Sequence, residues 1–323
     1  MGCSWRCFLL GMAAIAAGPV RADFLPMPDH VVVVIEENHS YSEIIGSPSA
    51  PYINQLARSG ASFTNSHGIE HPSQPNYLDI FSGSNQGVTA DLGVSGLGAR
   101  WPFTTPNLGA QLLAAGKTFI GYSESMPSVG YTGDGDLSPS QDNYRAKHNP
   151  WVMWQNDHPT SPNQLPSSVN RPFSDFPSDY SKLPTVSFVV PNEQNDMHSN
   201  TVPRADTWLH DNLDGYVQWA KSNNSLLIVT FDEDDGSQGN RIPTLFIGPM
   251  VNPGQYADSI DHYSLLRTLE DMYGLGNQGY LGGAANRDAI ASPFVPEPAT
   301  VLLLPIAGVA LLVATRRASS PAT

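Results

Sequence analysis

Cysteine and basic residues are scarce in this 323-residue chain. Its two cysteines, Cys3 and Cys7, lie at the very start. The rest of the chain therefore offers neither a disulfide framework nor a thiol nucleophile. Only 16 Lys and Arg face 30 Asp and Glu, which gives a formal net charge of −14 at pH 7. Such a charge does not attract nucleic acid, and it repels phosphorylated substrates unless cations neutralise the site.

Long apolar runs occur only near the two ends. Residues 1–22 combine Arg6, an apolar stretch over 8–17 and the pattern Val20-Arg-Ala22. These features are typical of a secretory signal peptide that is cleaved on export. An uncleaved membrane anchor is the alternative, although the apolar stretch is short for a span. Neither cysteine follows the apolar stretch, which argues against a lipoprotein.

At the other end, Val295-Pro-Glu-Pro298 precedes the apolar stretch 299–315, which Arg316 and Arg317 close. This length is near the lower limit for a transmembrane helix, so the simple interpretation is a C-terminal anchor with cytoplasmic arginines. The three parts in this order resemble the PEP-CTERM sorting signal of Gram-negative bacteria, here over 295–317 with 318–323 as a tail. The resemblance implies processing by an exosortase. It also implies a place in the periplasm, at the cell surface or outside the cell, with the C-terminus as a membrane anchor or released.

The remaining residues, 23–294, are long enough for one large α/β domain. Nearly continuous apolar runs at 30–35 and 226–231 predict strands that are buried on both faces of a parallel sheet. Strand-like and helical segments alternate, which predicts a doubly wound α/β sandwich with a mostly parallel central sheet. Residues 123–182 show little periodicity, so we expect an irregular insertion or cap beside the site. The expected strands are 30–35, 118–122, 185–190, 226–231 and 244–247, and the expected helices are 50–59, 75–82, 106–115, 205–222 and 262–273.

Two acidic clusters directly follow predicted strands, as Glu36-Glu-Asn38 and as Asp232-Glu-Asp-Asp-Gly236. Ligands of an open α/β sheet bind beyond the carboxyl ends of its strands, so the two clusters can converge on one divalent cation. Alternation along the first strand directs Glu36 away from its neighbour. The local alternative is that both acidic runs only solvate turns, a role that we assign to Asp234 and Asp235. The candidate metal ligands are Glu37, Asn38, Asp232 and Glu233.

A candidate hydroxyl nucleophile, Ser73, lies between the two clusters in His71-Pro-Ser-Gln-Pro75. Pro75 would occupy the first turn of helix 75–82, so the Ser73 hydroxyl would face unpaired backbone N–H groups. Such groups can stabilise a phosphorylated intermediate. The alternative is that Ser73 is only the N-cap of the helix. Because a divalent cation polarises a phosphoryl group and activates a bound hydroxyl, the pattern indicates a metal-assisted hydrolase.

Six motifs keep one order over about residues 30–275. They are Val-Ile-Glu-Glu-Asn-His-Ser-Tyr, His-Pro-Ser-Gln-Pro-Asn-Tyr-Leu-Asp-Ile-Phe-Ser-Gly, Lys-His-Asn-Pro-Trp, Val-Pro-Asn-Glu-Gln-Asn-Asp-Met-His, Phe-Asp-Glu-Asp-Asp-Gly and the segment that begins at His262. They resemble the bacterial phosphoesterase family, which holds acid phosphatases and nonspecific phospholipases C. That family belongs to the alkaline-phosphatase-like superfamily. The resemblance therefore implies an alkaline-phosphatase-like fold, a divalent metal ion of unspecified identity and a phosphoserine intermediate.

The resemblance also implies roles for individual residues. Ser73 matches the nucleophile, and Glu37, Asn38, Asp232 and Glu233 match the metal ligands. His71 and His148 match positions that contact phosphate or protonate the leaving group. Catalytic His198, together with Asp196 and His262, matches positions that line the phosphate site or bind a second metal in relatives. The compressed spacing Asp196-Met-His198 favours a single metal, while a loop role for His148 and a helix-capping role for His262 stay open.

These features lead us to expect hydrolysis of phosphomonoesters in the manner of an acid phosphatase. A phospholipase C that cleaves phosphodiesters is the alternative within the enzyme class, and an inactive surface or matrix protein is the alternative outside it. A sulfatase is disfavoured because no Arg stands two residues after Pro in Ser73-Gln-Pro-Asn-Tyr77. The expected partners are a phosphate-ester substrate, exosortase-type sorting machinery and, before processing, the membrane; nucleic acid is not among them.

Overall fold

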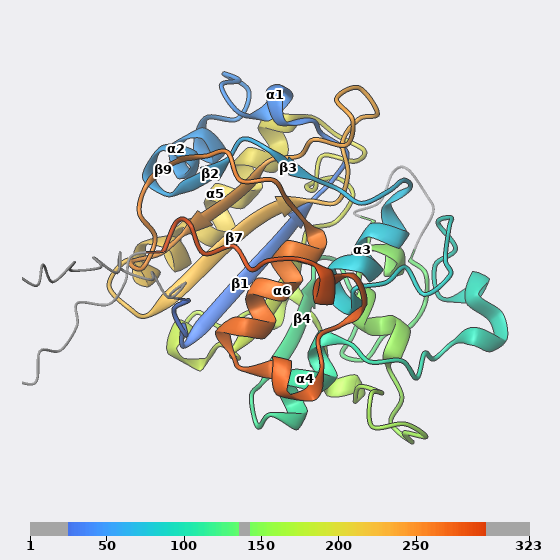
Figure 1. Ribbon diagram of the computed structural model, residues 1–323. Helices are drawn as coiled ribbons and strands as arrows, with labels where there is room; N and C mark the ends of the chain where they lie inside the picture. The colour runs from blue at the N-terminus through green and yellow to red at the C-terminus, as the bar shows by residue number, and fades with distance from the viewer. Residues whose placement is uncertain (1–24, 136–142, 295–323) are drawn as a thin grey trace, which may run out of the picture.

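A mostly parallel eight-stranded sheet lies at the centre of the computed structural model, which describes residues 25–135 and 143–294 (Figure 1). The strands are β1 (His30–Glu36), β2 (Ala61–Phe63), β3 (Ser66–His67), β4 (Phe119–Ser123), β5 (Asn170–Pro172), β6 (Val186–Val190), β7 (Ser225–Phe231), β8 (Thr244–Ile247), β9 (Gly254–Tyr256) and β10 (Ile260–Asp261). The order in the sheet is β5-β4-β6-β1-β7-β8-β2-β9. β1 pairs in parallel with β6 and β7, whereas β8 runs antiparallel to its neighbours β7 and β2. β3 and β10 form a separate parallel pair.

Helices cover both faces of the large sheet. They are α1 (Tyr41–Ile44), α2 (Pro51–Ser59), α3 (Ser73–Ser82), α4 (Leu108–Ala114), α5 (Val202–Ala220) and α6 (His262–Met272). Local signals set several of their ends: α2 begins at Pro51, and the Asn107 side chain accepts the Ala110 N–H (2.9 Å) at the start of α4. Gly83, at a φ of 69°, ends α3 in the left-handed conformation that glycine adopts readily.

The side chains of β1 alternate between two hydrophobic cores. Val31 and Val33 pack with residues of α3, α4 and α6, whereas Val32 and Val34 pack with residues of α2 and α5. All four valines are fully buried, as expected for a strand covered on both faces. In Figure 1, α6, α3 and α4 lie in front of the sheet, and the sandwich is completed behind it by α2 and α5.

The expected fold class is confirmed, and each expected strand and helix is present, with ends that match at 244–247 and are shifted elsewhere. The largest consequence for the site is at α3, which begins at Ser73 and not at residue 75. The three-residue strands β2, β5 and β9 were not predicted, because three residues are too few to show an alternating pattern.

Of the irregular region predicted at 123–182, the structure describes residues 123–135 and 143–182. It contains short 3₁₀ helices and the edge strand β5. Trp151 and Trp154 from this region are fully buried, with the Trp151 ring 6.2 Å from Phe119 and the Trp154 ring 5.0 Å from Phe103. The region therefore supplies part of the core as well as a connection.

The predicted signal peptide (1–22) and the PEP-CTERM-like segment (295–317) lie outside the described residues. Within the part of the chain that the structure describes, none of the helices has both the length and the apolar character needed to cross a membrane.

Candidate active site

The two acidic strand ends lie side by side, as the sequence predicts. Glu36 at the end of β1 pairs with Phe231 at the end of β7, and the Asp232 N–H donates to the Glu36 carbonyl (3.0 Å). The Asn38 N–H in turn donates to Oδ1 of Asp232 (3.1 Å). Asn38 has a φ of 56°, a left-handed conformation that Asn tolerates better than most residues. The turn after β1 is therefore shaped around the first carboxylate after β7.

Ser73 connects the two acidic clusters. It is the first residue of α3 and its side chain is buried. Its hydroxyl lies 3.0 Å from Oε2 of Glu37 and 3.4 Å from Oε1 of Glu233, so carboxylates of both clusters can accept its proton. Pro72, and not Ser73, occupies the N-cap position of α3. The geometry thus fits a reactive hydroxyl better than the N-cap that was the alternative.

A buried group suited to a metal ion lies on the same carboxylate. Glu37, His148 and Asp196 each offer a ligand atom, and these atoms all lie within 4.8 Å of one another. Nε2 of His148 is 3.2 Å from Oε1 of Glu37, and its Nδ1 is 3.7 Å from Oδ2 of Asp196. Asp196 and His148 come from two different loops, which is why their meeting at Glu37 could not be read from their spacing.

Several buried polar atoms around this group have no hydrogen-bond partner among the described residues. They are Nε2 of His148, Oδ2 of Asp196 and Oδ2 of Asp232. Buried polar atoms are normally satisfied, and a cation held by Glu37, His148 and Asp196 would supply a partner that the described residues lack. Carboxylates with one imidazole form a mixed oxygen and nitrogen set, which suits Mn, Zn or Fe as well as harder ions. The residues present therefore fit a divalent metal ion.

Burial raises the pKa of three carboxylates in the site, and repulsion from Asp232 adds to the rise at two of them. Burial and the charge of Asp232 raise the pKa of Glu37 well above its usual value, against the opposing effects of Lys147 and of the Tyr77 hydrogen bond. Burial raises the pKa of Asp232 to about 6, although the Asn38 N–H opposes the rise. Burial together with Asp232 raises the pKa of Glu233 to about 8. Glu37 and Glu233 therefore hold protons at neutral pH unless positive charge compensates them, whereas Asp232 is mostly ionised there.

Two residues of α3 that sequence reasoning missed hold these carboxylates in place. The Tyr77 hydroxyl donates to Oε1 of Glu37 (2.5 Å), and its ring stacks on His148 with centroids 5.2 Å apart. The Asn76 amide donates to Oε2 of Glu233 (3.3 Å). Their positions, three and four residues after Ser73, place them on the serine's face of the helix. That spacing was the signal that could have identified them.

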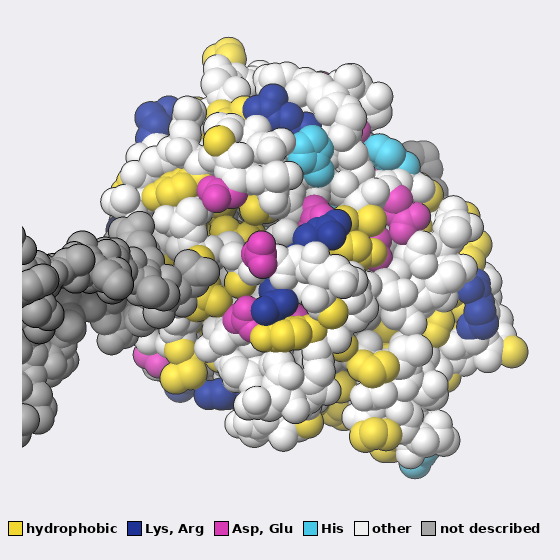
Figure 2. Space-filling model, viewed as in Figure 1, with side chains coloured by type: hydrophobic (Ala, Val, Ile, Leu, Met, Phe, Trp, Pro, Cys, Tyr) yellow, Lys and Arg dark blue, Asp and Glu magenta, His cyan; other side chains and the backbone are white. Residues whose placement is uncertain are grey.

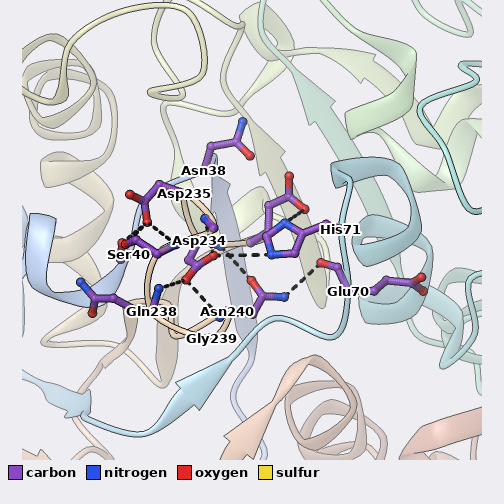
Figure 3. A network of polar contacts seen from close by, with 12 residues as sticks. Asn38, Ser40, Glu70, His71, Asp234, Asp235, Gln238, Gly239 and Asn240 are labelled. Atoms are coloured by element: carbon purple, nitrogen blue, oxygen red, sulfur yellow. Dashed lines mark hydrogen bonds and ion pairs between the residues drawn. The ribbon is translucent and has the colours of Figure 1, made fainter.

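His71 lies at the edge of the site, against the acidic turn that follows β7 at residues 232–236 (Figure 3). Its side chain is 46% exposed, with Nδ1 2.8 Å from Oε2 of Glu233 and Nε2 3.5 Å from Oδ1 of Asp234. Oδ2 of Asp234 accepts the N–H groups of Gln238 (2.8 Å) and Asn240 (3.0 Å). Asp234 thus serves the turn, in keeping with the sequence analysis.

The other two predicted histidines, His198 and His262, do not belong to the metal-binding group of the described residues. The rings of His198 and His148 have centroids 5.9 Å apart, and the His198 N–H donates to Oδ1 of Asp196 (2.8 Å) across Met197, which has a φ of 80°. This turn places Asp196, and not His198, in the metal-binding group. His262 is buried at the start of α6 with Nε2 3.0 Å from the Phe231 carbonyl.

Two further observations complete the surroundings. Glu36 is buried, neither of its carboxylate oxygens has a hydrogen-bond partner among the described residues, and burial followed by the charges of Asp196 and Glu124 raises its pKa. On the face shown in Figure 2, acidic and histidine side chains reach the surface near the end of the sheet to which β1 points, while hydrophobic side chains form only small scattered patches.

Proteins of known name match most of this chain. A phosphatidylinositol-3-phosphatase from Mycobacterium tuberculosis is 46% identical over 275 residues, which cover 84% of this chain and 86% of that protein. A probable acid phosphatase from Kluyveromyces lactis is 28% identical over 265 residues, with 79% of this chain and 60% of that protein covered. A phosphate-repressible acid phosphatase from Penicillium chrysogenum is 28% identical over 245 residues, with 72% and 57% covered. The chain thus spans less than two thirds of these two fungal relatives.

Solved structures share the fold. BT33494S-sulf of Bacteroides thetaiotaomicron, from a locus for metabolism of multiple glycosaminoglycans, superposes with a TM-score of 0.54 at 12% identity over 85% of this chain and 78% of that chain. Ps i-CgsB in complex with k-i-k-neocarrahexaose gives 0.52 at 15% identity, over 79% and 74%. At such identities the likeness shows the fold alone, a doubly wound α/β sandwich.

Fold, site and relatives together define a hydrolase that acts on phosphoric ester bonds. The chain belongs to the Phosphoesterase family, whose model matches residues 47–276.

Proposed function

We propose that this chain is an exported, metal-dependent phosphatase that hydrolyses phosphomonoesters through a phosphoserine at Ser73. The observation that carries the proposal is the 3.0 Å hydrogen bond from Ser73 Oγ to Oε2 of Glu37, in a buried cluster with unsatisfied ligand atoms. A serine hydroxyl is a weak nucleophile until a neighbouring base or metal activates it. Both kinds of activation fit the residues around Ser73.

The chain's own residues account for the proton and bond changes. The Ser73 hydroxyl proton passes to Glu37 or Glu233 as Oγ forms a bond to phosphorus and the ester P–O bond breaks. The leaving alcohol takes up a proton, and water then cleaves the phosphoserine to release phosphate and restore the hydroxyl. His71 is better placed than His148 to protonate the alcohol, because His71 is 46% exposed whereas His148 is buried against Glu37.

A divalent metal ion, when bound, would polarise the phosphoryl group and offset the charge of the carboxylates. Glu37 and Asp232 from the predicted set would hold it, together with Asp196 and His148. Glu233 contacts Ser73 from the other side, and the Asn38 backbone supports Asp232. The group of Glu37, His148 and Asp196 among the described residues supports the proposal of a single metal ion.

The names of the relatives favour phosphomonoesters over phosphodiesters, because the three reported above are phosphatases. The Mycobacterium tuberculosis relative makes phosphatidylinositol 3-phosphate the first specific substrate to test. Hydrolysis of p-nitrophenyl phosphate and of p-nitrophenyl phosphorylcholine, each with and without chelator, separates a phosphatase from a phospholipase C. We expect metal-dependent release from the first compound. Ser59→Ala, at an exposed serine, is the control for Ser73→Ala.

Export and anchoring are proposed from the two end segments of the sequence. We expect the mature chain to begin near residue 23 and the C-terminal signal 295–317 to be processed by an exosortase-type enzyme in a Gram-negative host. N-terminal sequencing and mass determination of the full chain recovered from periplasmic, surface and medium fractions test both points. Recovery of the intact chain in the cytoplasm would contradict them. An inactive matrix protein would be supported by a folded, exported chain that binds no metal.

A further inference from the structure

Lys147 is a cation placed against the carboxylates of the site. Its Nζ lies 2.6 Å from Oδ2 of Asp91, and its side chain is only 15% exposed. Its charge acts on Glu37, Asp196 and Glu233. Basic residues are few in this chain, so a mostly buried lysine whose charge acts on the carboxylates of the site points to a specific role.

Asp91 fastens Lys147 next to the nucleophile. Its second oxygen, Oδ1, accepts the N–H of Gln74 (3.0 Å), and Gln74 directly follows Ser73 in α3. The Gln74 side chain also contacts the loop that carries Asp91: its Oε1 accepts the N–H groups of Leu92 (2.6 Å) and Gly93 (2.9 Å). One carboxylate therefore joins the start of α3 to the lysine, and the loop that carries it is pinned to the same helix.

Lys147 also lines a cavity. The cavity has a volume of about 400 Å³, which is large enough for a phosphate ester of moderate size. Arg145 on its wall forms an ion pair with Glu193 (2.7 Å). Among the described residues Asp91 is the hydrogen-bond acceptor of Lys147, and an ammonium group has three protons to donate. The lining residues are Asp91, Leu92, Gly93, Ser95, Asp134, Arg145, Lys147 and Glu193.

We propose that Lys147 is a catalytic residue that binds the nonbridging oxygens of the phosphoryl group, with the substrate in this cavity. The proposal rests on the phosphatase function proposed above. Carboxylates on Glu37 and Glu233 contact Ser73, those on Asp196 and Asp232 belong to the same site, and one divalent ion does not neutralise all four. Lys147 supplies the further positive charge from the cavity side. It keeps its proton throughout, while the Oγ–P bond forms and the ester bond breaks as described for Ser73.

Binding of inorganic phosphate to the purified, metal-loaded chain tests the proposal without relying on turnover. Isothermal titration calorimetry is compared for wild type, Lys147→Ala, Lys147→Arg and the control Lys182→Ala, whose side chain is 74% exposed in a surface pair with Asp179. A hydrogen bond to a charged group is worth about 1.5–3 kcal/mol, so Lys147→Ala should weaken phosphate binding roughly 10- to 100-fold. Lys147→Arg should recover part of the loss, because it keeps the charge but not the geometry. The control should bind as wild type does.

A second measurement uses the wild-type chain alone. Phosphate should slow acetylation of Lys147, followed by peptide mass spectrometry, and leave Lys182 unchanged. Equal phosphate affinity in wild type and Lys147→Ala, or no protection of Lys147, would overturn the proposal even if phosphomonoesters are hydrolysed. A chain that binds phosphate through Lys147 but hydrolyses no phosphomonoester would overturn the proposed function and, with it, the catalytic role of Lys147, and would leave only phosphate binding by this residue.

Discussion

The Tyr77 hydroxyl donates a 2.5 Å hydrogen bond to Oε1 of Glu37, whose other oxygen accepts the Ser73 hydroxyl. Tyr77 lies one helical turn after Ser73 in α3 and is fully buried. A single helix thus presents the candidate nucleophile and the group that orients its carboxylate partner. Groups that orient metal ligands commonly matter almost as much as the ligands themselves.

The first prediction follows from this contact. Tyr77→Phe removes one hydrogen bond from Glu37 and should lower metal affinity or kcat by roughly 10- to 100-fold, with a smaller change in KM. Tyr280→Phe is the matched control, because that hydroxyl also bonds a carboxylate, Asp271 at 2.6 Å. Metal titration and steady-state kinetics on both variants decide the point. Equal losses in the two variants would show that the Tyr77 hydroxyl acts only on stability.

A second prediction concerns metal removal. Chelation should lower the melting temperature, because the buried carboxylates then repel one another and Nε2 of His148 stays without a partner. Restored metal at about 100 times its Kd should return roughly 2.7 kcal/mol. His148→Ala should lose most of this metal-dependent increment. The exposed His210, paired with Asp211, provides the control His210→Ala, which should keep it. An equal melting temperature of the wild type with and without metal would contradict the proposed metal site.

The third prediction concerns pH and a residue outside the site. Burial raises the pKa of Glu270 to about 7, against a usual value of roughly 4.3, even though its Oε1 accepts the Leu281 N–H. The folded chain therefore binds the extra proton between these values, and this residue's contribution to stability is full below pH ~4 and is lost as the pH rises towards 7. Glu270→Gln should match wild type near pH 4 and be more stable by about 1–2 kcal/mol at pH 8, after allowance for solvent screening. Urea unfolding at both pH values tests this, and a difference that does not change with pH would contradict it.

The fourth prediction tests the core around the irregular region. An added Cβ at Gly121 of β4 would lie 2.0 Å from the Trp151 ring, so Gly121→Ala must displace that ring. Overpacking of this kind costs about 1–3 kcal/mol. Gly254→Ala is the control, because its Cβ would lie 3.7 Å from Tyr256. Thermal unfolding of both variants should show a clear loss only for the first, and a stable Gly121→Ala would mean that Trp151 is free to move.

Much of the fold could be predicted because its long strands carry strong patterns. The continuous apolar runs of β1 and β7 predict strands that are buried on both faces of a sheet. Because parallel strands end at the same edge of a sheet, the acidic residues that follow them were expected to lie close together. Glu37, Asp232 and Ser73 were identifiable for that reason. Asp196 and His148 were predicted as site residues only through the family resemblance.

The remaining features depend on tertiary contacts that no local pattern encodes. Asp196 reaches Glu37 through a turn at Met197, and Lys147 is held by Asp91, 56 residues earlier in the chain. The start of α3 at Ser73 was mispredicted because Pro75 was taken as the first residue of the helix, whereas it is the third residue and lies in the first turn. Loop-to-loop contacts of this kind become visible only when the chain is folded.

The central claim is that Ser73 carries the phosphoryl group during turnover. The most direct measurement is acid quenching of wild type during hydrolysis of p-nitrophenyl phosphate, followed by peptide mass spectrometry of the α3 segment. We predict phosphoserine at Ser73 in wild type and its loss, together with activity, in Ser73→Ala. Full metal-dependent activity in Ser73→Ala, or phosphate found on another residue, would contradict the account.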